Sequence, residues 1–101
     1  MIVEFTAGAA QVREADDCTR LDVATSLEAA DLDTVLAATG TGTRDGENVL
    51  LDVGALRERA RAAAAAPDWE SRWAAMIDYA ARKGWLSLDG TTVQAHIEQG
   101  R

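Results

Sequence analysis

The strongest pattern of apolar residues along the chain lies between Pro67 and Gly84. Pro67 suits the first turn of a helix, and Gly84 suits the position just after the last turn. The segment between them predicts an amphipathic helix over residues 68–83, with Trp73 in the middle of its buried stripe. The residues that recur at the spacing of one helical face are Trp69, Trp73, Met76, Ile77, Ala80 and Ala81.

Two earlier segments also carry helical patterns. Residues 27–39 follow Thr25-x-x-Glu28, a spacing typical of the capping box at a helix start, and Gly40 suits the left-handed position after the end. Residues 55–65 place apolar residues on one side of a helix and arginines on the other. We therefore expect helices over 27–39 and 55–65.

Alternation of apolar and polar residues predicts strands in the first half of the chain. It is clear over residues 2–6 and 19–25, shorter around 11–14, and it recurs over 48–53 after the turn signal Asp45-Gly46. We expect these segments to form an antiparallel sheet of three or four strands within residues 2–53. With most helices following, the fold class is α+β, and the C-terminal helices cover one face of this small sheet.

Two patterns compete over residues 91–98. The alternation of Val93 and Ala95 with polar neighbours is typical of a hairpin strand after the turn Asp89-Gly90. Thr91-x-x-Gln94, in contrast, has the form of a capping box that opens a short helix. Of the two, we expect the helix.

Composition indicates one folded domain over residues 1–101. The chain has 48% hydrophobic and 27% charged residues, which is far from the composition of disordered proteins. Cys18 is the only cysteine, which excludes an internal disulfide and a zinc site of several thiolates and fits a reducing compartment. We see neither a signal peptide nor an apolar stretch of about 20 residues. We expect a cytoplasmic protein with no membrane contact, and its arginine-rich, alanine-rich composition suits a GC-rich bacterial genome.

The net charge of −7 is unevenly distributed along the sequence. Residues 1–52 hold eleven acidic and three basic residues, whereas residues 53–101 hold six acidic and seven basic ones. Such a distribution disfavours nucleic acid and could steer a basic protein partner toward the first half. A winged-helix arrangement of the helices 55–65 and 68–83 is disfavoured for the same reason, because helix 68–83 has no positive surplus.

No pattern of catalytic, cofactor-binding or metal-binding residues stands out. Cys18 and His96 are each unique in the sequence, and together they would allow a Cys–His nucleophilic pair. The neighbouring Asp16 and Asp17 oppose formation of a thiolate, so neither Cys18 nor His96 is taken as a site. The acids around residue 16 also lack the spacing of a calcium loop.

The three tryptophans carry the functional hypotheses. Trp, Tyr and Arg are the residues that anchor binding surfaces, and we expect a small alanine-rich core to leave some indoles uncovered. We expect Trp73 in the core and Trp69 and Trp85 at the surface. The predicted interface or ligand groove is formed by Trp69, Tyr79 and Trp85.

The leading hypothesis is a non-enzymatic interaction or regulatory module that binds a protein partner or forms a homodimer through a free face or edge of the sheet. The alternative is a small-molecule-binding domain or minor enzyme, with its groove between sheet and helices and an arginine orienting the ligand.

Overall fold

The C-terminal strand of the chain lies in the middle of its β-sheet. The computed structural model describes residues 1–99, and strand β6 (Thr92–Gln99) pairs there with a different strand on each edge. Its partners are β3 (Asp22–Thr25), in parallel, and β5 (Asn48–Asp52), antiparallel. The helix expected over residues 91–98 is therefore wrong, because the alternating pattern prevails over the capping signal.

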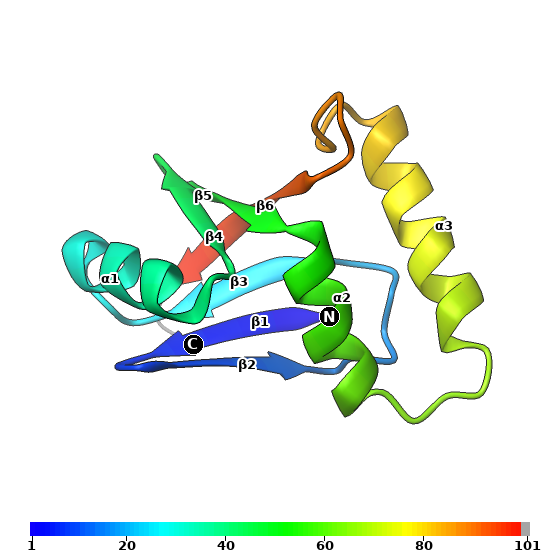
Figure 1. Ribbon diagram of the computed structural model, residues 1–101, viewed down its shortest axis with the longest axis horizontal. Helices are drawn as coiled ribbons and strands as arrows, with labels where there is room; N and C mark the ends of the chain where they lie inside the picture. Colours follow the sequence, from blue (N-terminus) through cyan, green and yellow to red (C-terminus); the bar gives the residue numbers. More distant parts are fainter. Residues whose placement is uncertain (100–101) are drawn as a thin grey trace.

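Six strands and three helices make up the fold (Figure 1). The remaining strands are β1 (Ile2–Thr6), β2 (Ala9–Arg13) and β4 (Gly42–Asp45), and the helices are α1 (Ala29–Thr39), α2 (Val53–Ala63) and α3 (Trp69–Arg82). The spatial order of the strands is β2-β1-β3-β6-β5-β4.

The sheet is mixed and curled into a half-barrel, which corrects the expected fold class. Strand β1 pairs antiparallel with β2 but parallel with β3, so the first three strands do not form an antiparallel sheet. Strand β4 is not among the strands expected from the sequence, and it pairs with β5 as a hairpin. The small antiparallel sheet of three or four strands in the N-terminal half is therefore wrong in strand number, in pairing and in its limit to residues 2–53.

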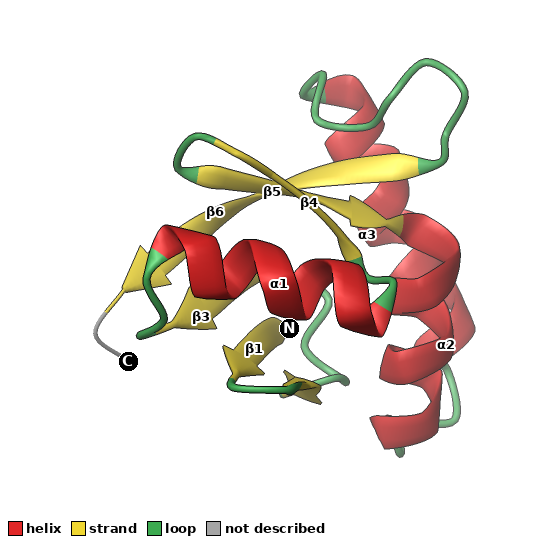
Figure 2. Ribbon diagram, turned by 60° about the vertical axis from the view of Figure 1, so that its left-hand side comes forward, coloured by secondary structure: helices red, strands yellow, loops and turns green. Residues whose placement is uncertain are grey.

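Helices α1 and α2 cover the face of the sheet that carries its large apolar side chains. Figure 2 shows α1 lying on the concave side of the curled sheet, with α2 beside one end of the strands. Helix α1 packs against β1, β2 and β4, and α2 packs against β2 and β5. The apolar side chains of these strands and helices belong to one core cluster, which includes Val3, Phe5, Val23, Leu32, Leu36, Val49, Leu51, Leu56 and Val93.

The start of α1 differs from the expected capping box. The helix begins at Ala29, and the carboxylate of Glu28 does not cap it. Thr25 instead bridges two segments in the core: its hydroxyl donates to the carbonyl of Phe5 (3.0 Å) and accepts from the amide of Leu27 (3.0 Å). Thr25 therefore provides hydrogen-bond partners for two backbone groups at the point where β3 turns toward α1.

Helix α3 confirms the amphipathic helix predicted over residues 68–83. Trp73 is buried as expected, and the ring of Trp69 stacks on it with centroids 5.5 Å apart. In Figure 1, α3 stands beyond α2 at the end of the sheet where β1 begins. Ion pairs join the two helices: Glu70 contacts Arg57 and lies 3.7 Å from Arg61.

The opposite face of the sheet is mainly polar. Register pairs place residues of neighbouring strands in rows on this face, which include Glu4, Asp22, Asn48, Gln94, His96 and Glu98. Ile2, Ala24 and Leu50 lie in the same rows, and of these only Ala24 is buried. This face therefore offers little apolar area for another layer.

The close packing of the β4–β5 hairpin makes Gly42 a sensitive position. A Cβ atom there would clash with the backbone carbonyl oxygen of Leu50 and lie 3.1 Å from the Cα atom of Leu51. We expect Gly42→Ala to lower the free energy of unfolding by about 1–3 kcal/mol, because backbone atoms would have to move. Urea unfolding measures this change.

Gly54→Ala is the matched control for this substitution. Gly54 lies in the first turn of α2, where a Cβ atom would meet only the carboxylate of Asp52 at 3.5 Å. Alanine has the higher helix propensity, so this variant should be as stable as the parent or more stable by up to about 1 kcal/mol. Equal losses in both variants would contradict the packing argument.

Candidate functional site

A cavity of about 510 Å³ lies between the C-terminal half of α3 and the sheet. It is found where β6 changes its partner on one edge. Residues Trp85–Ser87 pair beside the start of β6, through the bonds Gln94 N to Trp85 O (2.8 Å) and Ser87 N to Thr92 O (2.9 Å). From His96 onward the same edge pairs with β3. The cavity opens at this change, and Leu21, Trp85 and Ala95 are among its lining residues.

Trp85 is held in place by its backbone on both sides. Gly84 adopts a left-handed conformation (φ 78°) after α3, and the amide of Trp85 donates to the carbonyl of Ala80 (2.9 Å). This is the bond of a Schellman-type helix end, as the position of Gly84 predicted. The carbonyl of Trp85 accepts from Gln94, as described above. The backbone of Trp85 is therefore positioned by the end of α3 and by β6 together.

Two half-exposed aromatic rings border the cavity. Tyr79 is 47% exposed and Trp85 is 44% exposed, and their ring centroids are 5.9 Å apart in an edge-to-face arrangement. Two cations lie over the Tyr79 ring, with the Arg82 guanidinium carbon 6.0 Å and the Lys83 Nζ 5.5 Å from its centroid. Tyr79, Arg82 and Trp85 all line the cavity.

A row of polar residues from three adjacent strands forms the opposite wall. His96 of β6 is the register partner of Asp22 in β3 and of Asn48 in β5, so the three side chains share one face of the sheet. All three line the cavity. The carboxylate of Asp22 accepts from Arg20 at both Nε (2.9 Å) and Nη2 (2.5 Å), and this pair neutralises both charges.

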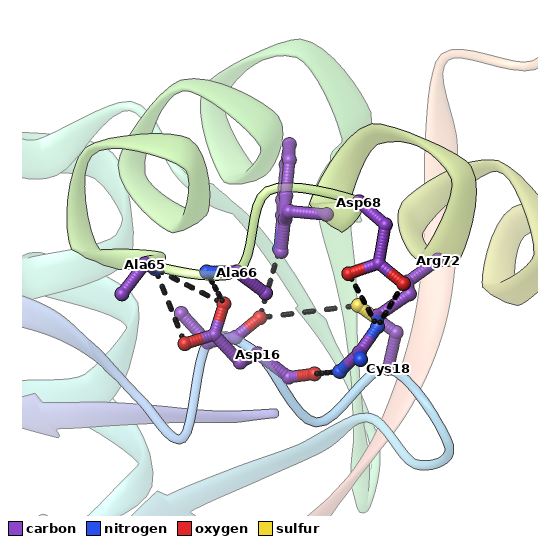
Figure 3. A network of polar contacts seen from close by, with 8 residues as sticks. Asp16, Cys18, Ala65, Ala66, Asp68 and Arg72 are labelled. Carbon is purple, nitrogen blue, oxygen red and sulfur yellow. Dashed lines mark hydrogen bonds and ion pairs between the residues drawn. The ribbon is translucent and has the colours of Figure 1, made fainter.

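The loop that brings Cys18 to Leu21 to the cavity is fixed by a polar network (Figure 3). The carboxylate of Asp16 accepts from the amides of Ala65 (3.1 Å) and Ala66 (2.9 Å) in the linker between α2 and α3. Arg72 of α3 donates to the carbonyl of Asp16 (3.2 Å) and also pairs with Asp68 (3.1 Å). The network therefore joins the loop to the linker and to α3.

Trp69 belongs to this network rather than to the cavity. It is 4% exposed, and its indole Nε1 donates to the carbonyl of Ala15 (2.8 Å). The expected exposure of Trp69 is therefore wrong, because a carbonyl of the 14–20 loop satisfies its polar group in the interior. Of the three residues predicted for a groove, the structure brings Tyr79 and Trp85 together and places Trp69 elsewhere.

Cys18 and His96 both line the cavity, although no spacing or motif predicted that they would lie together. The thiol of Cys18 donates to the carbonyl of Ala15 (3.8 Å), and burial raises the pKa of this thiol above its usual value. A protonated thiol is a poor nucleophile, so this geometry does not favour the Cys–His chemistry considered above.

The chain was compared with known protein families, with curated proteins and with solved structures, and no match was found in any of them. Among residues 1–99, no three His, Cys, Asp or Glu residues are grouped so that they could hold a metal ion. None of the helices in this part of the chain has the length and apolarity needed to cross a membrane.

The Asp16 network generates a prediction about the cavity wall. Asp16→Ala removes the acceptor of the Ala65 and Ala66 amides, and we expect a loss of about 1–2 kcal/mol in the free energy of unfolding. Amide hydrogen exchange at both alanines should accelerate. Asp16→Asn keeps one acceptor oxygen and should lose less. Unchanged exchange in Asp16→Ala would contradict the proposed anchoring.

The loop after Trp85 generates a prediction about pH. Ser87 Oγ and Thr91 Oγ1 each donate to the Asp89 carboxylate at 2.7 Å, and these bonds lower the pKa of Asp89 from 3.8 to about 2. Because the folded pKa is the lower one, ionised Asp89 stabilises the fold fully above pH 4, and this stabilisation is lost as the pH falls toward 2. The difference in Tm between the parent and Asp89→Asn should therefore shrink from pH 6 to pH 2.

Asp45→Asn is the control for the pH series. The carboxylate of Asp45 accepts no hydrogen bond within the described residues, so its removal should change the pH dependence of Tm less. Parallel Tm curves for the parent and Asp89→Asn between pH 6 and pH 2 would show that the Asp89 hydrogen bonds do not stabilise the fold.

Proposed function

We propose that the protein is a non-enzymatic binding module that takes a small organic molecule with a planar ring in the cavity between α3 and the sheet. One observation carries this proposal. Within residues 1–99, three large hydrophobic side chains are exposed, and two of them, Tyr79 and Trp85, line the cavity with their rings in contact. Clustering of exposed apolar side chains beside a cavity is typical of binding sites.

The size and chemistry of the cavity support a small ligand. Its volume of about 510 Å³ falls within the range of about 300–1,000 Å³ that is usual for small-molecule sites. Apolar side chains such as Met76 and Ile77 contribute to one side, and polar groups converge from the strands on the other. An apolar wall facing a few polar groups is the arrangement that orients a small ligand.

The two aromatic rings suit a planar partner. Trp and Tyr provide large apolar area at low conformational cost, and ring pairs favour stacked or edge-to-face contacts. The Trp85 backbone is already fixed by Ala80 and Gln94, so less freedom is lost when a ligand binds.

The alternatives from the sequence are less well supported by the geometry. Strand β6 comes from the second half of the chain and lies between strands of the first half. The acidic first half therefore does not form a separate unit that could bind a basic partner by itself. The sheet face opposite α1 is mainly polar, which weakens the case for a homodimer through it. Homodimerisation through a sheet edge stays a prediction. The hydrogen-bonded thiol of Cys18 favours binding over catalysis.

The test is a screen of planar aromatic fragments by two-dimensional NMR of the ¹⁵N-labelled protein. Its three tryptophans give three indole N–H signals, and Trp85→Phe assigns one of them. Binding fragments should shift the Trp85 signal and leave those of the buried Trp69 and Trp73 nearly unchanged. Trp85→Ala should weaken binding by about tenfold or more, because a central aromatic anchor is lost.

Leu88→Ala is the matched control for Trp85→Ala. Leu88 is fully exposed but does not line the cavity, so its removal should leave fragment affinity unchanged. The proposal fails if no fragment shifts the Trp85 signal, or if affinity depends on Leu88 and not on Trp85.

A further inference from the structure

Arg82 differs from the other arginines of residues 1–99. Arg59 donates to the carbonyls of Ala10 (3.1 Å) and Thr39 (3.5 Å). Within this part of the chain, Arg82 is the arginine whose guanidinium has neither a carboxylate nor a carbonyl partner. The arginines that pair with carboxylates are Arg13, Arg20, Arg44, Arg57, Arg61 and Arg72.

The charges around the cavity leave a positive surplus at Arg82. The only acidic residue among the lining residues is Asp22, and Arg20 already neutralises it. Arg20 and Arg82 both line the cavity, so the charge of Arg82 is left unbalanced there, and Lys83 is the next residue in the sequence. A positive surplus at this one site contrasts with the net charge of −7 for the whole chain. Local charge of this sign favours an anionic ligand.

The position of Arg82 at the end of α3 has a simpler structural explanation. Cations near a helix C-terminus interact favourably with the helix dipole, and this needs no ligand. Lys83 is one residue further along and meets the same requirement. The helix dipole therefore accounts for a cation here, but it does not account for a guanidinium that borders both the cavity and the Tyr79 ring.

We infer that the cavity binds an aromatic acid, with its ring against Trp85 and Tyr79 and its carboxylate or phosphate on the guanidinium of Arg82. This inference rests on the proposed function of the cavity. A guanidinium suits both groups because it forms two parallel hydrogen bonds to the oxygens of either one. Asn48 and Gln94, on the opposite wall, offer amide donors and acceptors to neutral polar atoms at the ring edge.

The experiment compares acids with neutral counterparts of the same ring. The pairs are benzoate and benzamide, indole-3-acetate and indole-3-acetamide, and adenosine 5′-monophosphate and adenosine. Acetate and inorganic phosphate test the anion without a ring. Dissociation constants come from NMR titration of the full chain. In at least one pair, the acid should bind about tenfold more tightly than its neutral counterpart. The pairs separate a carboxylate ligand from a phosphate ligand.

Variants of two arginines separate a specific contact from general charge. Arg82→Gln should weaken binding of the preferred acid by about tenfold and leave its neutral counterpart unchanged. Arg82→Lys should retain part of the affinity. Arg61→Gln makes the same change of charge on α2, away from the cavity, and should leave both affinities unchanged. Urea unfolding of each variant checks that α3 is intact.

The outcomes distinguish this inference from the proposal on which it rests. If neutral and acidic members bind equally at the Trp85 signal, or if Arg61→Gln and Arg82→Gln weaken the acid alike, the inference is wrong while the binding function stands. If neither member of any pair shifts the Trp85 signal, and the fragment screen also fails, both are wrong. A preference for free acetate or phosphate over every aromatic acid would overturn the role of the ring.

Discussion

The sheet depends on the backbone hydrogen bonds that β6 makes on both of its edges. Without this strand, β3 and β5 would each lack a neighbour, and the sheet would separate into β2-β1-β3 and β5-β4. Two such fragments would expose unpaired strand edges, which are unfavourable in water and prone to wrong pairing. Because β6 is formed by residues 92–99, the sheet is complete only after nearly all of the described chain has been brought together. Contacts of this sequence separation are expected to slow folding.

The same strand creates the candidate site. On one edge, β6 pairs first with residues after α3 and then with β3, and these neighbours run in opposite directions relative to it. The two neighbours of β6 diverge near Ala95. Residues 85–87 follow Gly84 and α3, whereas β3 follows the loop that carries Cys18 and Leu21. The cavity is therefore a consequence of strand topology, and its walls come from segments that are distant in the sequence.

The parts of the fold that local patterns determine were predicted well. Helix α3 was predicted within one residue at each end, because its apolar stripe, Pro67 and Gly84 all indicate the same element. Residues 91–98 satisfied two local patterns at once, and only the edges of β3 and β5 decided between them. Local sequence patterns contain no information about hydrogen bonds to strands that are distant in the sequence. The strand order could therefore not be predicted.

The candidate site was also predictable only in part, namely for the residues whose exposure follows from local patterns. Tyr79 lies off the buried stripe of α3, and Trp85 follows the helix end, so both could be expected near the surface. Trp69 was misjudged because its position at the helix start suggested exposure, whereas it lies on the same stripe as Trp73 and has a carbonyl partner in a distant loop. The row formed by Asp22, His96 and Asn48 depends on the register of three strands. Without the strand order, no spacing in the sequence would have brought these residues together.

The exposure of Tyr79 and Trp85 follows from constraints that also stabilise the fold. The amide of Trp85 completes the end of α3 and its carbonyl completes an edge of β6, so the backbone of this residue is fixed at the border of the cavity. Leaving two large rings half in water forgoes part of the free energy that their burial would provide. The backbone hydrogen bonds of Trp85 set the position from which its indole meets the Tyr79 ring edge to face. The same hydrogen bonds that close the sheet therefore place a partly uncovered aromatic pair beside the cavity, and a fixed backbone at this point fits the ligand site proposed above.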